Sequence, residues 1–343
     1  MSRRVAVLMG GRSSEHEVSL SSARAVIDAL DPARYEVVPV LISQEGDWSV
    51  DGRPVAIAPG PDGTGRLVRL DGGPAETLDV VFPVLHGPNG EDGTVQGLLE
   101  TAGLPYVGSG VAASAVAMDK ALFKVLLRDA GIPTPEHRTA SRAEWAADPA
   151  AVGRRIADGV GYPAFCKPAR LGSSVGISPV PTPADLASSL ELAFRHDPKA
   201  LVERAVTGRE VEVGVLDGDE PVVSPVGEIL YEGDWYDYDT KYLPGRTRVQ
   251  VPADLPAAVS ERARELALRA FRAAECSGLA RVDFFVTADG EVLLSELNTM
   301  PGFTPTSVYA QLLDGAGVPY AEVVERLIEL GISRAAAARE FLC

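Results

Sequence analysis

The sequence is short of positive charge. Lys and Arg together make up 32 of its 343 residues against 48 Asp and Glu, which gives a formal net charge of −16. Binding to nucleic acid needs basic side chains that neutralise phosphates, and an anionic membrane surface attracts basic proteins for the same reason. The composition therefore argues against a partner of either kind.

Cysteine is also scarce. The three thiols, Cys166, Cys276 and Cys343, are too widely spaced for a metal-binding pattern or a disulfide framework. Residues 1–10 lack the apolar region of a signal peptide, and glycines and a proline interrupt the uncharged stretch 101–118, so no membrane span is expected. These features predict a protein of the reducing cytoplasm.

Strands and helices alternate near the N-terminus. Apolar runs at 4–10, 36–42 and 79–85 predict buried strands, and a helix is expected over about 19–30. This alternation is typical of a parallel sheet covered by helices. The stretch 58–74 is rich in Gly, Pro and Asp, and we expect it to be a surface loop.

The remaining chain predicts smaller units with strands and helices of their own. Helices are expected over about 117–130, 183–196 and 256–276, strands over 162–167, 200–203, 210–216 and 221–229, and a polar, aromatic-rich loop over 231–248. The fold class that follows is α/β, with two or three packed units.

The most informative feature is a predicted β-hairpin over 279–297. A two-residue turn at its Asp-Gly step would place Asp283 opposite Glu296 and Arg281 opposite Asn298, with all four side chains on one face. A longer loop would shift this register unless a β-bulge restored it.

Two carboxylates and an amide on one face favour a metal site. The carboxylates repel each other, and a hard divalent cation relieves that repulsion. Mg²⁺ takes oxygen ligands from a few protein groups and from substrate phosphates. The alternative is a solvated strand face. Val282, Phe284, Leu293 and Leu297 make the opposite face apolar, which favours a half-buried ribbon with the polar face in a site.

Two glycine-containing segments could bind phosphates. The segment 167-KPARLGSSVG-176 follows a strand and offers Lys, Arg and backbone N–H groups, although the P-loop motif G-x-x-x-x-G-K-[ST] occurs nowhere. The segment 108-GSGVAAS-114 loosely matches the dinucleotide motif, which makes a dinucleotide-linked oxidoreductase a rival hypothesis. Asp129 lies at about the spacing of that motif's acidic residue, but near a helix end and not a strand end.

Polar residues follow two of the N-terminal strands. In 10-GGRSSEHEVSLSS-22, Glu15 and Glu17 could receive an ammonium group, whereas ordinary helix capping explains Ser19 equally well. His86 lies just past a strand end, where open α/β sheets bind ligands, although a lone His is more often structural.

Together these segments resemble the D-alanine–D-alanine ligases of the ATP-grasp superfamily. Eight motifs occur in the family's order between residue 5 and about residue 310: GGRSSEHEVS, HGPNGEDG, MDK, KPARLGSSVG, VTGREVEVGVL, YDYDTKY, RVDFF and ELNTMPGFTPTS. Each is weak alone, but eight in order are specific. The resemblance implies a Rossmann-like N-terminal domain (1–114), followed by two α+β ATP-grasp subdomains (115–207 and 208–343) with a lid loop at 231–248 and ATP between them.

The resemblance also implies a role for each matching residue. Nucleotide contacts are expected from Lys120, Lys167, Glu203, Arg204, Val206 and Glu210. Two Mg²⁺ (or Mn²⁺) ions are expected on Asp283, Glu296 and Asn298. The first D-alanine is expected near Glu15 and His86, its reacting carboxyl near Arg281 and Gly302, and the second D-alanine near Ser307, Val308 and Lys241. Hydrogen bonds are expected to link Glu15, Ser173 and Tyr242, joining the first domain to the lid.

The implied reaction has two steps. The carboxylate of one D-alanine attacks the γ-phosphate of ATP, and the amine of a second D-alanine attacks the resulting acyl phosphate. Tyr242 in the lid favours D-alanine as the second substrate, and a homodimer is usual in the family. The sequence departs from the family at Arg204, Ala205 and Val308, where Lys, a large apolar residue and Leu are common. The alternatives are a related ligase that uses D-serine or D-lactate and a non-catalytic binding module.

Overall fold

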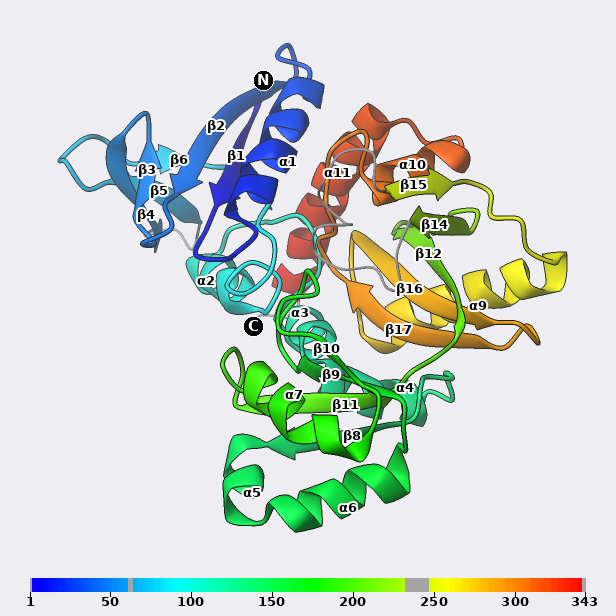
Figure 1. Cartoon of the computed structure of the whole chain (residues 1–343). Coiled ribbons are helices and arrows are strands. Elements are labelled where there is room, and N and C mark those ends of the chain that lie inside the picture. The colour runs from blue at the N-terminus through cyan, green and yellow to red at the C-terminus, as the bar shows by residue number, and fades with distance from the viewer. Residues whose placement is uncertain (1, 61–63, 232–246, 341–343) are drawn as a thin grey trace.

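The computed structural model describes residues 2–60, 64–231 and 247–340, whose strands form three sheets (Figure 1). The first sheet has the order β6-β5-β4-β3-β2-β1-β7 and comprises β1 Arg3–Gly10, β2 Tyr35–Ile42, β3 Trp48–Val50, β4 Arg53–Pro59, β5 Gly65–Arg69, β6 Glu76–Thr77 and β7 Val80–Pro83. The second has the order β10-β9-β11-β8 and comprises β8 His137–Ser141, β9 Ala164–Pro168, β10 Ser178–Val180 and β11 Lys199–Arg204. The third has the order β15-β14-β12-β16-β17, with β13 beside β12, and comprises β12 Gly208–Leu216, β13 Val222–Val223, β14 Gly227–Tyr231, β15 Thr247–Gln250, β16 Leu279–Thr287 and β17 Val292–Asn298.

Helices cover these sheets. They are α1 His16–Ala29, α2 Thr94–Ala102, α3 Val111–Met118, α4 Lys120–Asp129, α5 Arg142–Ala147, α6 Pro149–Gly159, α7 Leu186–Ala193, α9 Ala257–Ala273, α10 Val308–Gly315 and α11 Tyr320–Arg339, with a 3₁₀ turn at Pro183–Asp185. Within the described ranges, none of the helices combines the length and the apolar run that crossing a bilayer requires.

The first sheet confirms the predicted parallel core and extends it. β1 pairs in parallel with β2 and with β7. The surface loop expected over 58–74 is wrong in part, because β4 ends at Pro59 and β5 occupies Gly65–Arg69 as its antiparallel partner. Val55 and Leu67 of this pair are buried, 3% and 0% exposed. Glycine and proline interrupt the apolar alternation by which such short strands would be predicted. β4 is stabilised by pairing with β3 and β5, and β5 by pairing with β4.

The helix expected over about 117–130 is in fact two helices. Asp119 has extended backbone angles between α3 and α4, and its carboxylate accepts the N–H groups of Ala121 and Leu122 at 3.1 Å. An aspartate in this position caps the following helix instead of continuing the preceding one. Its second oxygen pairs with Lys199 on β11. The break places Lys120 in the first turn of α4.

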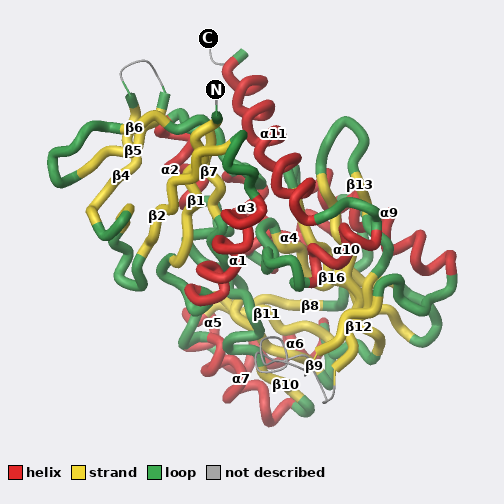
Figure 2. The backbone as a smooth tube through the Cα atoms, turned by 90° about the horizontal axis from the view of Figure 1, so that it is seen from above, coloured by secondary structure: helices red, strands yellow, loops and turns green. Residues whose placement is uncertain are grey.

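The C-terminal helix α11 belongs with the first sheet in space (Figure 2). Its Leu327 and Ile328 are fully buried in one apolar cluster with Val5 and Phe82 of the sheet. The guanidinium of Arg334 donates to the Tyr106 carbonyl at 3.2 Å and lies 4.2 Å from the centre of the Tyr106 ring. The chain therefore returns at its end to cover the unit with which it began.

Gly331 allows α11 to approach this closely. A Cβ at position 331 would lie 2.6 Å from the Tyr106 carbonyl oxygen, a backbone atom that cannot rotate away. Alanine in a helix interior normally stabilises by about 1 kcal/mol relative to glycine. We expect Gly331→Ala to do the opposite and lower the free energy of unfolding by about 2 kcal/mol, because overpacking outweighs propensity.

The matched control is Gly153 in α6, where a Cβ would meet nothing within 4 Å. We expect Gly153→Ala to raise the free energy of unfolding by about 0.5–1 kcal/mol. Urea unfolding of both variants measures the two changes. Equal effects at the two sites would show that α11 does not pack as described.

Candidate active site

A cleft of about 1010 Å³ lies among elements that belong to all three sheet units. Its walls include the start of α1, the segment after β7, the loop after β9, the β16–β17 hairpin and the segment before α10. The predicted site residues that line it are Glu15, His86, Lys120, Ser173, Arg281, Glu296, Asn298, Gly302, Ser307 and Val308. Residues almost 300 positions apart in the sequence thus share one cavity.

The β16–β17 hairpin has the predicted pairing at its functional end. Asp283 lies opposite Glu296, and Arg281 lies opposite Asn298. Paired residues of neighbouring strands project from the same face, so these four polar side chains form one surface. The apolar partners on the other face, such as Val282 and Leu297, are buried.

The turn of this hairpin differs from the prediction. The N–H of Thr287 donates to the carbonyl of Glu291 at 3.0 Å, so three residues, 288–290, connect the strands. This longer loop shifts the pairing by one residue, as in Phe284 opposite Leu294. A bulge between positions 283 and 284 then restores the predicted register. The prediction was right for the site because two departures compensate.

Arg281 is the positive centre of this face. Its Nε and Nη2 donate to the two carboxylate oxygens of Asp283 at 2.8 and 2.7 Å, and Nε also lies 2.9 Å from Oε2 of Glu212 on β12. Burial opposes the charge, but Asp283 and Glu212 outweigh it and raise the pKa of Arg281 well above its ordinary value. The guanidinium is therefore a fixed cation beside the cleft.

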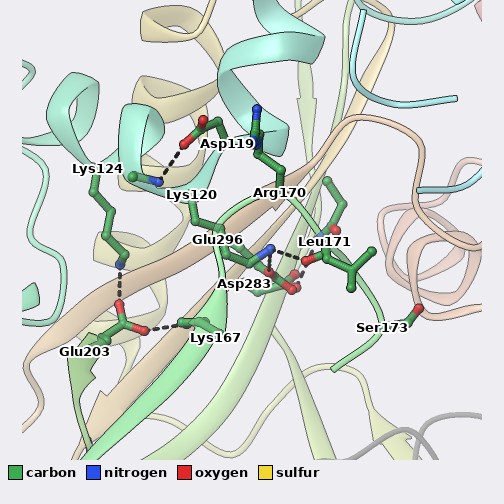
Figure 3. A network of polar contacts seen from close by, with 12 residues as sticks. Asp119, Lys120, Lys124, Lys167, Arg170, Leu171, Ser173, Glu203, Asp283 and Glu296 are labelled. Atoms are coloured by element: carbon green, nitrogen blue, oxygen red, sulfur yellow. Dashed lines mark hydrogen bonds and ion pairs between the residues drawn. The ribbon is translucent and has the colours of Figure 1, made fainter. Parts of the chain in front are cut away.

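The Lys120 ammonium is a second cation at the same place (Figure 3). It lies 3.2 Å from Oε2 of Glu296 and donates to the Leu171 carbonyl at 2.8 Å. Leu171 belongs to the glycine-containing loop 167–176, so this lysine connects α4, that loop and the hairpin. Lys120 and Arg281 both line the cleft, so two cations face the same cavity.

The oxygen atoms of this face fit a hard cation. Asp283 is central, Glu296 lies opposite it, and the amide of Asn298 donates to Asp283 at 3.0 Å. Two carboxylates and one amide suit Mg²⁺, which binds to one or two protein carboxylates and completes its shell with phosphates and water. Within the described ranges no three His, Cys, Asp or Glu residues gather as a metal site, so phosphate oxygens would have to supply further ligands.

A buried triad lies beside this face (Figure 3). The carboxylate of Glu203, at the end of β11, pairs with the ammonium groups of both Lys124 and Lys167. Lys124 is fully buried on α4 and also donates to the Thr134 hydroxyl at 2.5 Å. Burial disfavours the Glu203 charge, but the two lysines outweigh it and lower its pKa to about 2. One carboxylate thus holds two ammonium groups in place.

Glu15 links the first unit to the glycine-containing loop. It is 8% exposed before α1, and its Oε1 accepts the hydroxyl proton of Ser173. Ser173 and Ser174 have left-handed backbone angles, φ 52° and 57°, which turn this loop toward Glu15. Two members of the predicted Glu15–Ser173–Tyr242 link therefore meet. Tyr242 and Lys241 lie outside the described residues.

Three side chains of the N-terminal unit hold the segment 300–303. His86 places Nδ1 2.9 Å from the Met300 carbonyl and Nε2 3.0 Å from the Ser22 hydroxyl. Glu91 accepts the Met300 N–H at 3.0 Å, and Ser22 accepts the Phe303 N–H at 3.1 Å. Since Gly302 lies between these anchored groups, its backbone has a fixed direction.

The other predicted residues surround this centre. The hydroxyl of Tyr231 donates to Glu210 at 2.7 Å. Arg204 is exposed and Val206 half-buried at the end of β11. Ser307 occupies the N-cap position of α10 without a side-chain capping hydrogen bond, and Val308 is the first residue of that helix. Lys167, Glu203, Arg204, Val206, Glu210 and Asp283 are not part of the cleft lining, and Asp283 lies directly behind Arg281.

Two family models together match most of the chain. The model described as the D-ala D-ala ligase N-terminus matches residues 4–109, and the one described as the D-ala D-ala ligase C-terminus matches residues 126–329. The chain belongs to the D-alanine–D-alanine ligase family. Its resemblance to this family, first seen in eight short motifs, is confirmed over nearly its full length.

Named relatives and solved structures agree with this membership. The D-alanine--D-alanine ligase of Deinococcus radiodurans is 52% identical over 97% of this chain and 99% of its own, and that of Geobacillus thermodenitrificans is 45% identical over 97% and 96%. The D-alanine-D-alanine ligase structure from Coxiella burnetii has a TM-score of 0.88 at 35% identity, covering 99% of this chain and 97% of its own. The VanG D-Ala:D-Ser ligase from Enterococcus faecalis has a TM-score of 0.87 at 35% identity, covering 96% and 100%. The predicted ATP-grasp α/β fold is confirmed.

In this family member the rival dinucleotide motif has a packing role. Arg334 of α11 donates to the Gly108 carbonyl. A Cβ at Gly108 would lie 3.5 Å from Met300 Cε, so the segment 108–114 is packed against protein. Gly110 then caps α3. The glycines serve close packing and a helix start, which sets the oxidoreductase hypothesis aside.

Sequence reasoning missed four residues of this site: Lys124, Glu212, Glu91 and Ser22. A signal existed for the first two. The chain has only five lysines, at 120, 124, 167, 199 and 241, and the four in the described part all pair with carboxylates. Glu212 alternates with Glu210 along one strand, which placed both on the same face. The contacts that bring Glu91 to Met300, and Ser22 to His86 and Phe303, join distant parts of the chain, and no local pattern indicated them.

We expect Glu91 to make the stability of the fold dependent on pH. Burial and the neighbouring Glu15 raise its pKa to about 8, although the N–H groups of Gly87 and Met300 donate to it. Between its ordinary pKa of 4.5 and about 8, the native state holds a proton that the unfolded chain releases. Its contribution to the free energy of unfolding therefore falls as pH rises, by at most about 2 kcal/mol from pH 6 to 8.

Glu91→Gln should abolish this decrease in the free energy of unfolding between pH 6 and pH 8, since glutamine does not titrate. Urea unfolding at pH 6 and pH 8 measures it. Glu36→Gln is the control. The hydrogen bond with Arg4 lowers the pKa of Glu36, so this carboxyl group stays ionised between pH 6 and pH 8. A wild-type pH slope in Glu91→Gln would refute the assignment.

Proposed function

We propose that this chain joins two D-alanine molecules into D-alanyl-D-alanine for peptidoglycan precursors, releasing ADP and phosphate through a D-alanyl phosphate. The observation that carries this proposal is the polar face of the β16–β17 hairpin, where Asp283, Glu296 and Asn298 lie beside Arg281 and Lys120. Phosphoryl transfer depends mainly on positioning and charge neutralisation, which such a face supplies.

The triphosphate would bind along the lysines. Lys120 and Lys167 would contact its phosphates, Glu203, Arg204 and Val206 would lie along the adenine, and Glu210 would accept a ribose hydroxyl. Asp283, Glu296 and Asn298 would hold two Mg²⁺ (or Mn²⁺) ions, which neutralise charge on the transferring phosphoryl group. Support comes from the carboxylates that already hold these ammonium groups.

The first D-alanine would lie between Glu15 and Arg281. Glu15 would receive its ammonium group, with His86 close by. Arg281 and the backbone N–H of Gly302 would face the carboxyl group and the negative charge that develops when the second amine attacks. Support for the last role is that Ser22, His86 and Glu91 anchor the backbone on both sides of Gly302.

The second D-alanine would lie near Ser307 and Val308 at the start of α10. Lys241 would be nearby, and Tyr242 would complete the link through Ser173 to Glu15. Closure of the segment 231–248 over the acyl phosphate would exclude water, which otherwise hydrolyses it. We also propose the division into 1–114, 115–207 and 208–343, because each segment contributes its strands to a different sheet.

The test is phosphate release from Mg·ATP with D-alanine, L-alanine, D-serine or D-lactate, combined with chromatography of the product. We expect release to depend on D-alanine and D-alanyl-D-alanine to be the main product. A dominant mixed product with D-serine or D-lactate would favour a related ligase. No D-alanine-dependent release would contradict the proposal.

We propose a homodimer in the cytoplasm. Leu122 and Val125 on α4 are 53% and 49% exposed beside a hollow lined by Ala112 and Val116. Arg128 and Asp129 bring opposite charges to its edge, so this apolar surface suits a second copy of the chain. The buried free thiols Cys166 and Cys276 suit a reducing compartment. Light scattering of the purified protein measures the oligomeric state.

A further inference from the structure

Three carboxylates form a row across the third sheet. Glu212 on β12 is paired with Asp283 on β16, which is paired in turn with Glu296 on β17. Directly opposite residues in adjacent strands have Cβ atoms about 5 Å apart on one face. Glu212 is only 5% exposed, so it is a buried neighbour of the proposed ion ligands.

Arg281 is shared between two members of this row. Its guanidinium donates to both oxygens of Asp283 at 2.8 and 2.7 Å, and its Nε lies 2.9 Å from Glu212 Oε2. Asn298 also donates to Asp283, at 3.0 Å. Both carboxylate oxygens of Asp283 therefore accept hydrogen bonds from protein donors in this arrangement.

This sharing sets up a competition. An ion bound by Asp283 needs the same oxygens that accept the Arg281 protons. Arg281 must then loosen its hold on Asp283, and a buried guanidinium without a carboxylate partner is strongly disfavoured. Glu212 is the carboxylate that would remain paired with Arg281 when Asp283 binds the ion.

We propose that Glu212 is a positioning residue that holds Arg281 in place while Asp283 is given over to the metal ion. The inference rests on the proposed function, since it takes Asp283 as an ion ligand. Glu212 lines the cleft beside Arg281, but it is not one of the residues proposed to bind substrate or ion. By keeping the guanidinium beside the reacting carboxyl group, it lets one arginine serve catalysis without blocking the ion site.

The test measures Mn²⁺ binding directly. The electron paramagnetic resonance signal of free Mn²⁺ is followed during titration of the full-length protein with β,γ-methylene-ATP present. In Glu212→Gln, Asp283 is the carboxylate that still bonds to Arg281, so the guanidinium competes with the ion and the Kd for Mn²⁺ should rise about tenfold. Glu228→Gln is the matched control, because Glu228 is buried in the same sheet and pairs with Arg209 at 2.6 Å outside the cleft.

A second pair of variants separates positioning from simple loss of negative charge. In an Arg281→Met background the competitor is gone, so adding Glu212→Gln should leave the Kd for Mn²⁺ unchanged. An effect of equal size in both backgrounds would mean that Glu212 acts through its charge alone and would overturn the proposal. Should Glu212→Gln fail to fold, Glu212→Asp replaces it, with a smaller rise expected in the wild-type background only.

The outcome is independent of substrate identity. An unchanged Kd in Glu212→Gln, or an equal rise in Glu228→Gln, overturns the positioning role. Failure of D-alanine-dependent phosphate release in the wild type would overturn the proposed function and leave the arginine–ion competition standing.

Discussion

Asp283→Asn should lower kcat for D-alanine-dependent phosphate release by about a thousandfold. Asparagine has nearly the same shape but removes the charge at the centre of the polar face. Its amide nitrogen would also lie against the Arg281 donors, which now bond to the two carboxylate oxygens at 2.8 and 2.7 Å. Charge on the transferring phosphoryl group would then be poorly neutralised in the transition state.

The measurement is steady-state phosphate release with saturating ATP, D-alanine and Mg²⁺. Asp289→Asn is the control, because Asp289 lies at the turn of the same hairpin, where its carboxylate accepts the hydroxyl proton of Thr287. We expect it to retain wild-type kcat. If kcat of Asp283→Asn fell less than tenfold while the protein stayed folded and bound nucleotide, Asp283 would have no essential role in the reaction.

Glu203→Gln should cost more stability than any other single change at the site, about 3–5 kcal/mol. Glu203 is 3% exposed and is the carboxylate shared by Lys124 and Lys167. Removing the negative charge of Glu203 leaves the ammonium groups of Lys124 and Lys167 close together without the carboxylate that pairs with both. Lys124→Met should cost less, because Glu203 and Lys167 remain a neutral pair.

Urea unfolding of the two single variants and the double variant Lys124→Met/Glu203→Gln forms a double-mutant cycle. The double variant should be more stable than Glu203→Gln alone, since it contains one fewer unpaired ammonium. The affinity for ATP should fall in Glu203→Gln, because Lys167 loses the group that directs it. Additive losses of stability would show that the three charges do not act as a unit.

The two residues behind these predictions differ in how far the sequence revealed them. Asp283 was predicted from the hairpin pattern, since alternation along a strand places side chains on a known face. For Glu203 only the family resemblance suggested a role, which was contact with the adenine of ATP. The charge-pairing partner Lys124 was not predicted, because its contact with Glu203 joins α4 to β11 through the packing of the second unit.

Local patterns in the sequence therefore determined the parallel strands of the first sheet, the shared face of the β16–β17 hairpin and the family. Each depends on residues close in sequence, whose geometry is set by strand periodicity or by motif order. Only the tertiary structure decided which distant groups meet. Examples are Glu212 beside Arg281, and the Ser22, His86 and Glu91 contacts that hold the backbone around Gly302. Such contacts depend on which distant strands pair and on how separate sheets pack, and no local pattern of residues encodes either.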